Sequence, residues 1–223
     1  MHAETFADAG ALARHAASRV AGLCRDAVAA RGACHLVLAG GRTPERCYTL
    51  LAAMDLPWPA LHIWFGDERC LPPGDPGRND AMADRALLAH VPIPAGQVHR
   101  IPAELGPEAA AAAYAAELAA APAMDVVLLG LGEDGHTASL FPGNPALDDA
   151  RPAVPVHDAP KPPPERVSMS LAALNAARRR LVLVSGGGKA DALARIRGGE
   201  PLPAARLAAA EWLVDRDAAG TPA

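Results

Sequence analysis

The stretch Gly130-Leu-Gly-Glu-Asp-Gly-His-Thr-Ala-Ser-Leu-Phe-Pro-Gly143 decides how the rest of the chain is interpreted. It directly follows Met124–Leu129, a short run rich in valine and leucine that predicts a fully buried strand. Three glycines then allow a tight turn that can approach a ligand closely. Two carboxylates and an imidazole lie on that turn, those of Glu133, Asp134 and His136. Polar groups on a glycine turn beyond a buried strand are typical of the ligand crevice of an open α/β sheet.

A dinucleotide site is the first alternative for this stretch, because Gly130, Gly132 and Gly135 match the pattern G-x-G-x-x-G. That pattern binds a dinucleotide only where a long helix starts at the third glycine and the next strand ends in an acidic residue. Here Phe141-Pro-Gly143 stops such a helix soon after it would begin. The acidic residues that follow precede the next apolar run and do not end it. The context therefore argues against a dinucleotide, and a solvated turn without function is the remaining alternative.

Length and charge limit the classes of protein to which the chain can belong. Its 223 residues are enough for one sizeable core, and the absence of repeats and low-complexity linkers predicts a single domain over residues 1–223. A formal net charge of −4 offers no global attraction to nucleic acid or to an anionic membrane, so an anionic ligand must be held by a local cluster. We therefore expect a small-molecule ligand, no nucleic-acid partner, no membrane partner, and a monomer or a small homo-oligomer.

The four cysteines, Cys24, Cys34, Cys47 and Cys70, form no C-x-x-C motif and have no histidine at metal-binding spacing. Cysteines so far apart are typically reduced thiols in a cytoplasmic protein. The N-terminus carries no basic and then apolar leader pattern, and no stretch approaches the length of a membrane span. We expect a cytoplasmic protein without a bound metal.

Buried-strand patterns and helical patterns alternate along the chain. Strands are predicted at residues 34–39, 61–65, 98–101, 124–129, 179–185 and 211–215. Helices are predicted at residues 8–31, 43–54, 80–90, 107–120, 171–176 and 190–196. Residues 152–164 are too rich in proline for a central strand and suit an edge segment and a long loop. Because each polar cluster follows a strand, we predict an α/β fold: a mainly parallel, doubly wound, Rossmann-like sheet with helices on both faces.

Three further clusters follow predicted strands. In Gly40-Gly-Arg-Thr-Pro44, Thr43 suits the N-cap of a helix whose free N–H groups would make an anion site. Gly186-Gly-Gly-Lys189 is a second possible anion site, although Ala190 replaces the metal-binding Ser or Thr of a P-loop. Asp67-Glu-Arg69 places two carboxylates beside a guanidinium at a strand end. Each cluster taken singly also has an alternative without function. The first could be a plain turn, the second a solvated lysine and the third a surface ion pair.

As an ordered set, these motifs resemble the 6-phosphogluconolactonase family. The block from Asp134 to Gly143 is the specific part of the resemblance. The resemblance covers nearly the whole chain and rests on Gly40–Pro44, Asp67–Arg69 with Pro72, Asn79, Gly130–Gly143, Arg166–Ser170 and Gly186–Lys189. Two departures stand out: Arg42 replaces a serine often found in the first motif, and Arg78 stands where a serine commonly precedes the asparagine. Neither departure removes a catalytic group, and whether Arg42 and Arg78 contact the phosphate is left open by the sequence.

The resemblance implies an enzyme of the oxidative pentose phosphate pathway that hydrolyses 6-phospho-D-glucono-1,5-lactone to 6-phosphogluconate without metal or cofactor. Such hydrolysis needs a base to activate water, and histidine titrates near neutral pH. His136 is the candidate base, with Asp134 or Asp67 orienting it. Arg69 or backbone N–H groups of the glycine turns would stabilise the oxyanion. The substrate phosphate is expected among Gly40, Gly41, Arg42, Thr43, Arg166 and Lys189.

Two rival functions share parts of this pattern. Glucosamine-6-phosphate deaminases have the same fold, but carry an acidic residue in an Asn-Glu-Pro step just after the histidine block. This chain has Leu140-Phe-Pro-Gly143 there, which leaves no carboxylate to assist ring opening. A sugar-phosphate sensor attached to a DNA reader would need a helix-turn-helix segment and a basic face, and a chain of net negative charge with one helix before residue 34 fits neither.

Overall fold

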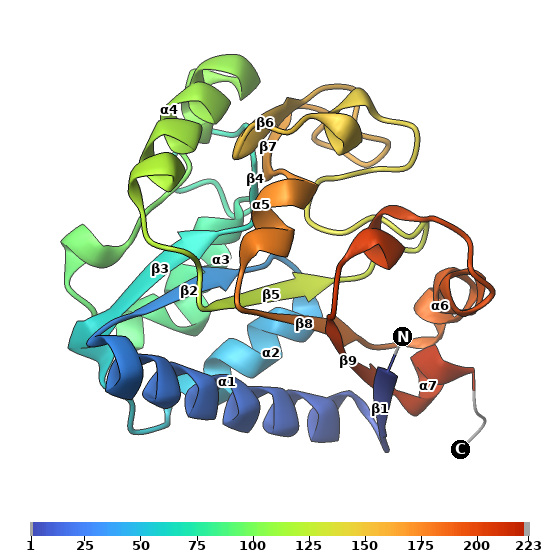
Figure 1. Cartoon of the computed structure of the whole chain (residues 1–223), viewed down its shortest axis with the longest axis horizontal. Coiled ribbons are helices and arrows are strands. Elements are labelled where there is room, and N and C mark those ends of the chain that lie inside the picture. Colours follow the sequence, from blue (N-terminus) through green and yellow to red (C-terminus); the bar gives the residue numbers. More distant parts are fainter. Residues whose placement is uncertain (1, 221–223) are drawn as a thin grey trace.

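A six-stranded parallel sheet forms the centre of the computed structural model, which describes residues 2–220 (Figure 1). Its order is β1-β9-β8-β5-β2-β3. The strands are β1 His2–Phe6, β2 Cys34–Leu38, β3 Leu61–Phe65, β5 Val126–Gly130, β8 Arg179–Val184 and β9 Glu211–Asp215. Central parallel strands are covered on both faces, which is why β2, β5 and β8 are almost continuous apolar runs. The predicted fold class is confirmed.

The helices follow the strands and cover the sheet. They are α1 Ala9–Arg31, α2 Arg42–Ala52, α3 Asn79–Ala86, α4 Pro107–Ala120, α5 Leu171–Ala176, α6 Ala190–Arg197 and α7 Arg216–Ala219. Figure 1 shows α1 and α2 along one side of the sheet and α4 and α5 on the other. Asp8 caps α1 by accepting from the N–H of Ala11, and Gly32 ends it in the left-handed region. Among residues 2–220, no helix combines the length and the apolar composition that a membrane crossing requires.

A second, three-stranded antiparallel sheet was not predicted. It has the order β4-β7-β6, with β4 at Asp67–Arg69, β7 at Arg166–Met169 and β6 at Ala153–Val156. Gly66 connects the two sheets, because its N–H donates to Leu38 of β2 and its carbonyl accepts from Met169 of β7. The proline-rich stretch supplies β6 at an edge of this sheet, as its composition predicts. The residues after β3 therefore belong to a strand and not to a simple strand-end turn.

Four local predictions need correction. The helix expected from Thr43 begins at Arg42, with Gly41 as its N-cap, and the Thr43 hydroxyl bonds to Ser185 Oγ at 2.7 Å. The strand expected at 98–101 is a single bridge between Val98 and β3. The helix expected over 80–90 ends at residue 86 and continues as a 3₁₀ turn. The N-terminal edge strand β1 was missed, because a five-residue segment with alternating polar side chains gains its strand character only from pairing with β9.

Candidate active site

The polar clusters meet at the carboxyl ends of β2, β3, β5 and β8, where two adjoining cavities open. The smaller cavity, of about 300 Å³, is lined among others by Asp67, Arg69, His136, Arg166 and Lys189. The larger cavity, of about 690 Å³, is lined among others by Arg42, Thr43, Arg46, Ser185 and Lys189. Both contain Gly40, Gly41, Gly130, Leu131 and Lys189, so they are two parts of one crevice. Of the predicted site residues, Asp134 alone lines neither cavity.

His136 is oriented by Asp134 at the wall of the smaller cavity. Its Nδ1 lies 2.5 Å from Asp134 Oδ1, and its backbone N–H donates to the same oxygen. Since an ionised carboxylate can only accept, Nδ1 carries a proton, and in the neutral form of the imidazole Nε2 keeps its lone pair. Burial raises the pKa of Asp134, but the hydrogen bond and the charge of the imidazole outweigh burial and bring that pKa down to about 2. The Phe141 ring packs against the imidazole, with the ring centroids 4.5 Å apart.

At two positions of this site a polar side chain lies so close to the backbone that only glycine fits. A Cβ on Gly132 would lie 2.0 Å from Nδ1 of His136, so a side chain there would push the imidazole away. A Cβ on Gly40 would lie 2.0 Å from Oδ1 of Asn79. The glycines at these positions therefore let the turns after β5 and β2 pass directly against polar side chains.

Asp67 belongs to a separate hydrogen-bond network and not to the His136–Asp134 pair. Its Oδ2 accepts from Ser139 Oγ at 2.6 Å and its Oδ1 accepts from Asn79 Nδ2 at 3.1 Å. Among residues 2–220, no hydrogen bond joins Asp67 to His136. The sequence left open whether Asp134 or Asp67 orients His136, and in the structure Asp134 is the carboxylate that contacts the imidazole. Ser139 and Asn79 were not proposed as site residues from the sequence, although both lie in the quoted motifs.

Glu68 faces away from the crevice and supports α3. Its carboxylate accepts the backbone N–H groups of Arg69, Asn79 and Asp80, at 2.7–2.9 Å. Burial raises the pKa of Glu68 to about 7, against the effect of these three N–H donors. The contact fixes the first turn of α3 and, with it, the Asn79 amide that contacts Asp67.

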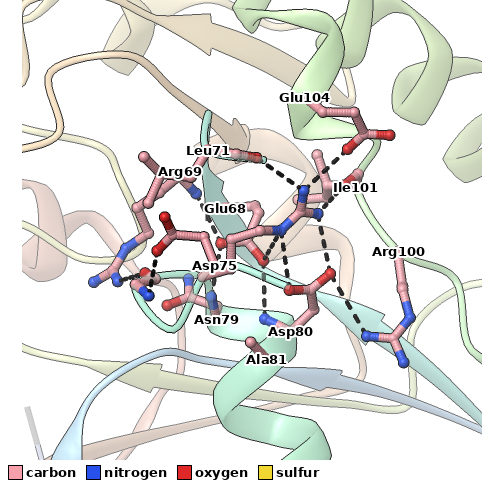
Figure 2. A network of polar contacts seen from close by, with 12 residues as sticks. Glu68, Arg69, Leu71, Asp75, Asn79, Asp80, Ala81, Arg100, Ile101 and Glu104 are labelled. Carbon is pink, nitrogen blue, oxygen red and sulfur yellow. Dashed lines mark hydrogen bonds and ion pairs between the residues drawn. The ribbon is translucent and has the colours of Figure 1, made fainter. Parts of the chain in front are cut away.

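Arg78 is buried and lies at the centre of a polar cluster beside α3. Figure 2 shows two carboxylates of this cluster, those of Asp80 and Glu104. It donates twice to Asp80, once to Glu104 and once to each of two backbone carbonyls, those of Leu71 and Ile101. It lines neither cavity. The sequence leaves open whether Arg78 contacts phosphate, and in the structure its donors are directed at carboxylates and carbonyls of this cluster and not at the crevice.

The two remaining predicted arginines of the smaller cavity have different environments. Arg69 donates through Nη1 to the carbonyl of Gly77, and its buried Nε has no hydrogen-bond partner among residues 2–220. Arg166 donates through Nη2 to the carbonyl of Lys161 and through Nε to that of Pro163, and its guanidinium lies 5.4 Å from the centre of the Phe141 ring. Arg166 thus fixes the loop before β7 through Nε and Nη2, whereas the buried Nε of Arg69 is left as a donor.

The chemistry of the crevice is that of a base and several cations around a small polar ligand. Lys189 lines both cavities and is half-buried, which lowers its pKa. Arg42, Arg46 and Thr43 stand at the far side of the larger cavity, where the N-terminus of α2 also points. Among residues 2–220, no three His, Cys, Asp or Glu side chains are grouped so as to hold a metal ion.

Comparison with known proteins gives the family. Residues 7–214 match the family model described as glucosamine-6-phosphate isomerases/6-phosphogluconolactonase. The chain belongs to this family. It is 44% identical to the 6-phosphogluconolactonase of Mycobacterium tuberculosis, over 97% of this chain and 96% of that protein. It is 43% identical to the 6-phosphogluconolactonase of Streptomyces coelicolor, over 93% and 89% of the two chains.

Solved structures agree with this membership. The crystal structure of 6-phosphogluconolactonase from Thermotoga maritima superposes with a TM-score of 0.89 at 28% identity, over 96% of this chain and 98% of that one. A monomeric glucosamine-6-phosphate deaminase superposes with a TM-score of 0.84 at 22% identity, over 100% of both chains. At that identity the second likeness shows a shared fold alone. The fold is therefore common to both activities of the family, and the side chains of the crevice must distinguish them.

Proposed function

We propose that the protein hydrolyses 6-phospho-D-glucono-1,5-lactone to 6-phospho-D-gluconate, the lactone step of the oxidative pentose phosphate pathway. The observation that carries the proposal is the His136–Asp134 pair, which leaves a basic Nε2 at a cavity that also contains Arg69. The names of relatives that are 43% and 44% identical over nearly their whole length support the same activity.

The proposed reaction begins with a water molecule that attacks the lactone carbonyl carbon. Nε2 of His136 takes a proton from this water, and Asp134 stabilises the imidazolium that forms. The carbonyl oxygen becomes negative in the tetrahedral intermediate, and the Arg69 guanidinium with backbone N–H groups of the glycine turns stabilises it. The intermediate then collapses, the C1–ring-oxygen bond breaks, and His136 returns the proton to the leaving oxygen. No metal or cofactor enters these steps.

Asp67 has a supporting role in this proposal. Its carboxylate is buried and accepts from Ser139 and Asn79, which fixes its orientation at the wall of the smaller cavity. A fixed negative charge there favours the cationic form of a neighbouring arginine or imidazole during the reaction. Asp67 acts as an electrostatic partner of the cavity, whereas Asp134 holds the base.

We propose that the phosphate of the substrate binds where the two cavities join. Lys189, Gly40 and Gly41 line both, with Arg166 on the smaller side and Arg42 and Thr43 on the larger side. Lysine and backbone N–H groups at a helix start are common phosphate ligands. We further propose that residues 1–223 act as one domain in the cytoplasm, as a monomer or small homo-oligomer, with this small molecule as the ligand and with no nucleic-acid or membrane partner.

An assay with freshly generated phosphogluconolactone, corrected for spontaneous hydrolysis, tests the proposal directly. The purified protein is expected to accelerate proton release from the lactone and to release no ammonia from glucosamine 6-phosphate. The apolar Phe141 ring against His136 supports the second expectation, because ring opening of an amino sugar needs a proton carrier and Phe141 cannot supply one. Catalytic ammonia release that disappears with His136→Ala would overturn the assignment in favour of the deaminase.

A further inference from the structure

The chain contains two lysines and 19 arginines, and both lysines pair with the same carboxylate. Lys161 Nζ lies 3.1 Å from Glu133 Oε2, and Lys189 Nζ lies 3.9 Å from Glu133 Oε1. The three residues come from three separate segments: the loop between β6 and β7, the turn after β8 and the turn after β5. Both lysines also line the smaller cavity. The two ammonium groups thus converge on one carboxylate, and both lysines, but not Glu133, line that cavity.

Hydrogen bonds hold the backbone of Lys161, whereas the side chain of Glu133 is exposed. Buried Arg166 donates to the carbonyls of Lys161 and Pro163 at 2.7 and 3.0 Å. A further backbone bond from Ala159 to Pro164 closes the loop. The Glu133 side chain, by contrast, is 60% exposed, and within residues 2–220 its ion-pair partners are the two lysines. The Glu133 side chain is thus more exposed than those of Lys161 and Lys189, which are 46% and 26% exposed and line the cavity.

A lysine suits such a site better than an arginine would. The ammonium group is a compact point charge with three rotatable donors, so two of them can approach a phosphate from different directions. A phosphate dianion carries more charge and more acceptor oxygens than the Glu133 carboxylate. It therefore outcompetes the carboxylate for the lysines, whereas a ligand without phosphate does not.

We propose that Lys161 acts together with Lys189 as a ligand of the substrate phosphate, and that Glu133 competes with that phosphate for both ammonium groups. The inference rests on the proposed function for the identity of the substrate, but the anion site itself does not depend on lactone hydrolysis. Glu133 is then a specificity-determining residue. Its carboxylate stays paired with the two lysines in the presence of weakly binding anions, and a phosphate dianion displaces it.

Because the chain has two lysines, each can be observed by itself. Reductive methylation with ¹³C-formaldehyde keeps the charge and labels both lysine side chains together with the α-amino group. Lys161→Arg and Lys189→Arg then assign the two lysine signals. Titration of the labelled protein with inorganic phosphate is expected to shift both signals along one saturation curve. Glu133→Gln should lower the Kd for phosphate about two- to tenfold, the range expected when one or two exposed ion pairs no longer compete.

Glu200→Gln is the matched control for this titration. Glu200 forms an exposed pair with Arg195 and lines neither cavity, so its loss changes the net charge equally without freeing the lysines. The Kd for phosphate should stay at the value of the unchanged protein. If phosphate moves neither lysine signal, or if Glu133→Gln leaves the Kd unchanged or raises it, the inference is overturned.

Kinetics supply a second, independent measurement. Glu133→Gln should lower KM for the phosphorylated lactone by the same factor with little change in kcat, and Lys161→Gln should raise that KM. Neither change should affect hydrolysis of unphosphorylated gluconolactone. Phosphate binding by both lysines without lactone hydrolysis would contradict the proposed function alone, whereas hydrolysis without a response of the lysines would contradict this inference alone.

Discussion

Two polar clusters stand side by side at the carboxyl end of the sheet, and they differ in what their side chains contact. In the cluster around Arg78, carboxylates and guanidinium groups bond to one another and to backbone groups, and the centre is buried (Figure 2). In the cluster around His136, one nitrogen is bonded to Asp134 and the other is left at a cavity. Similar residue types thus serve stability in the first cluster and chemistry in the second.

The strand β4 shows how the sequence divides residues between these clusters. Side chains alternate between the two faces of a strand, so Asp67 and Arg69 share one face and Glu68 takes the other. Asp67 and Arg69 line the smaller cavity, and Glu68 accepts the N–H groups that begin α3. Three consecutive charged residues therefore have two different roles, and it is the geometry of the strand that separates them.

Loss of the base is the change with the largest expected effect on the His136 cluster. His136→Ala should lower kcat roughly 100- to 10,000-fold with a smaller change in KM, because general base catalysis contributes about that much. Steady-state kinetics on the lactone, corrected for spontaneous hydrolysis, measure it. His90→Ala removes an exposed histidine that lines neither cavity and serves as the control. A His136→Ala protein with near-normal kcat would remove this histidine from the mechanism.

The Arg78 cluster should respond in the opposite way, through stability. Arg78→Met leaves Asp80, Glu68 and Glu104 without their shared cation and should lower the free energy of unfolding by about 3–5 kcal/mol. Arg100→Met is the control: this arginine also pairs with Asp80 but is 39% exposed, so about 1 kcal/mol or less is expected. Urea unfolding measures both. Equal losses for the two variants would show that burial does not distinguish the arginines.

The elements that the sequence predicted well are those whose patterns are local. The apolar run before Gly130 and the alanine-rich helix α4 need no distant partner to be recognised, and the Asp134–His136 contact spans two residues. Contacts between distant segments could not be predicted in this way. The second sheet pairs β4 with β7, Ser139 bonds to Asp67 across 72 positions, and Lys161 meets Glu133 across 28.

Loss of a phosphate ligand should reduce activity less than loss of the base, and only for the phosphorylated substrate. Lys189→Ala should raise KM for the phosphorylated lactone about 10- to 100-fold, the range expected for a lost hydrogen bond to a charged group. KM for unphosphorylated gluconolactone should change little, since that substrate has no group for the ammonium to bind. A comparison of the two substrates in the same variant measures the difference. Equal changes in both KM values would place Lys189 away from the phosphate.

The smallest expected effect is that of the Asp134 carboxylate, which orients His136 and also contributes to the stability of the fold. Its folded pKa of about 2 lies below the ordinary value of 3.8, so the folded protein binds fewer protons than the unfolded chain between these values. The stabilisation is therefore complete above about pH 4 and is lost as the pH falls toward 2. Because a third of the side chain is exposed, we expect only about 1 kcal/mol. Urea unfolding of the unchanged protein and of Asp134→Asn should differ by this amount at pH 6, and the difference should shrink by pH 2.5. A difference that stays constant over this range would mean that the Asp134 carboxylate is not stabilised by His136, and that the imidazole is oriented by its backbone and by Phe141 instead.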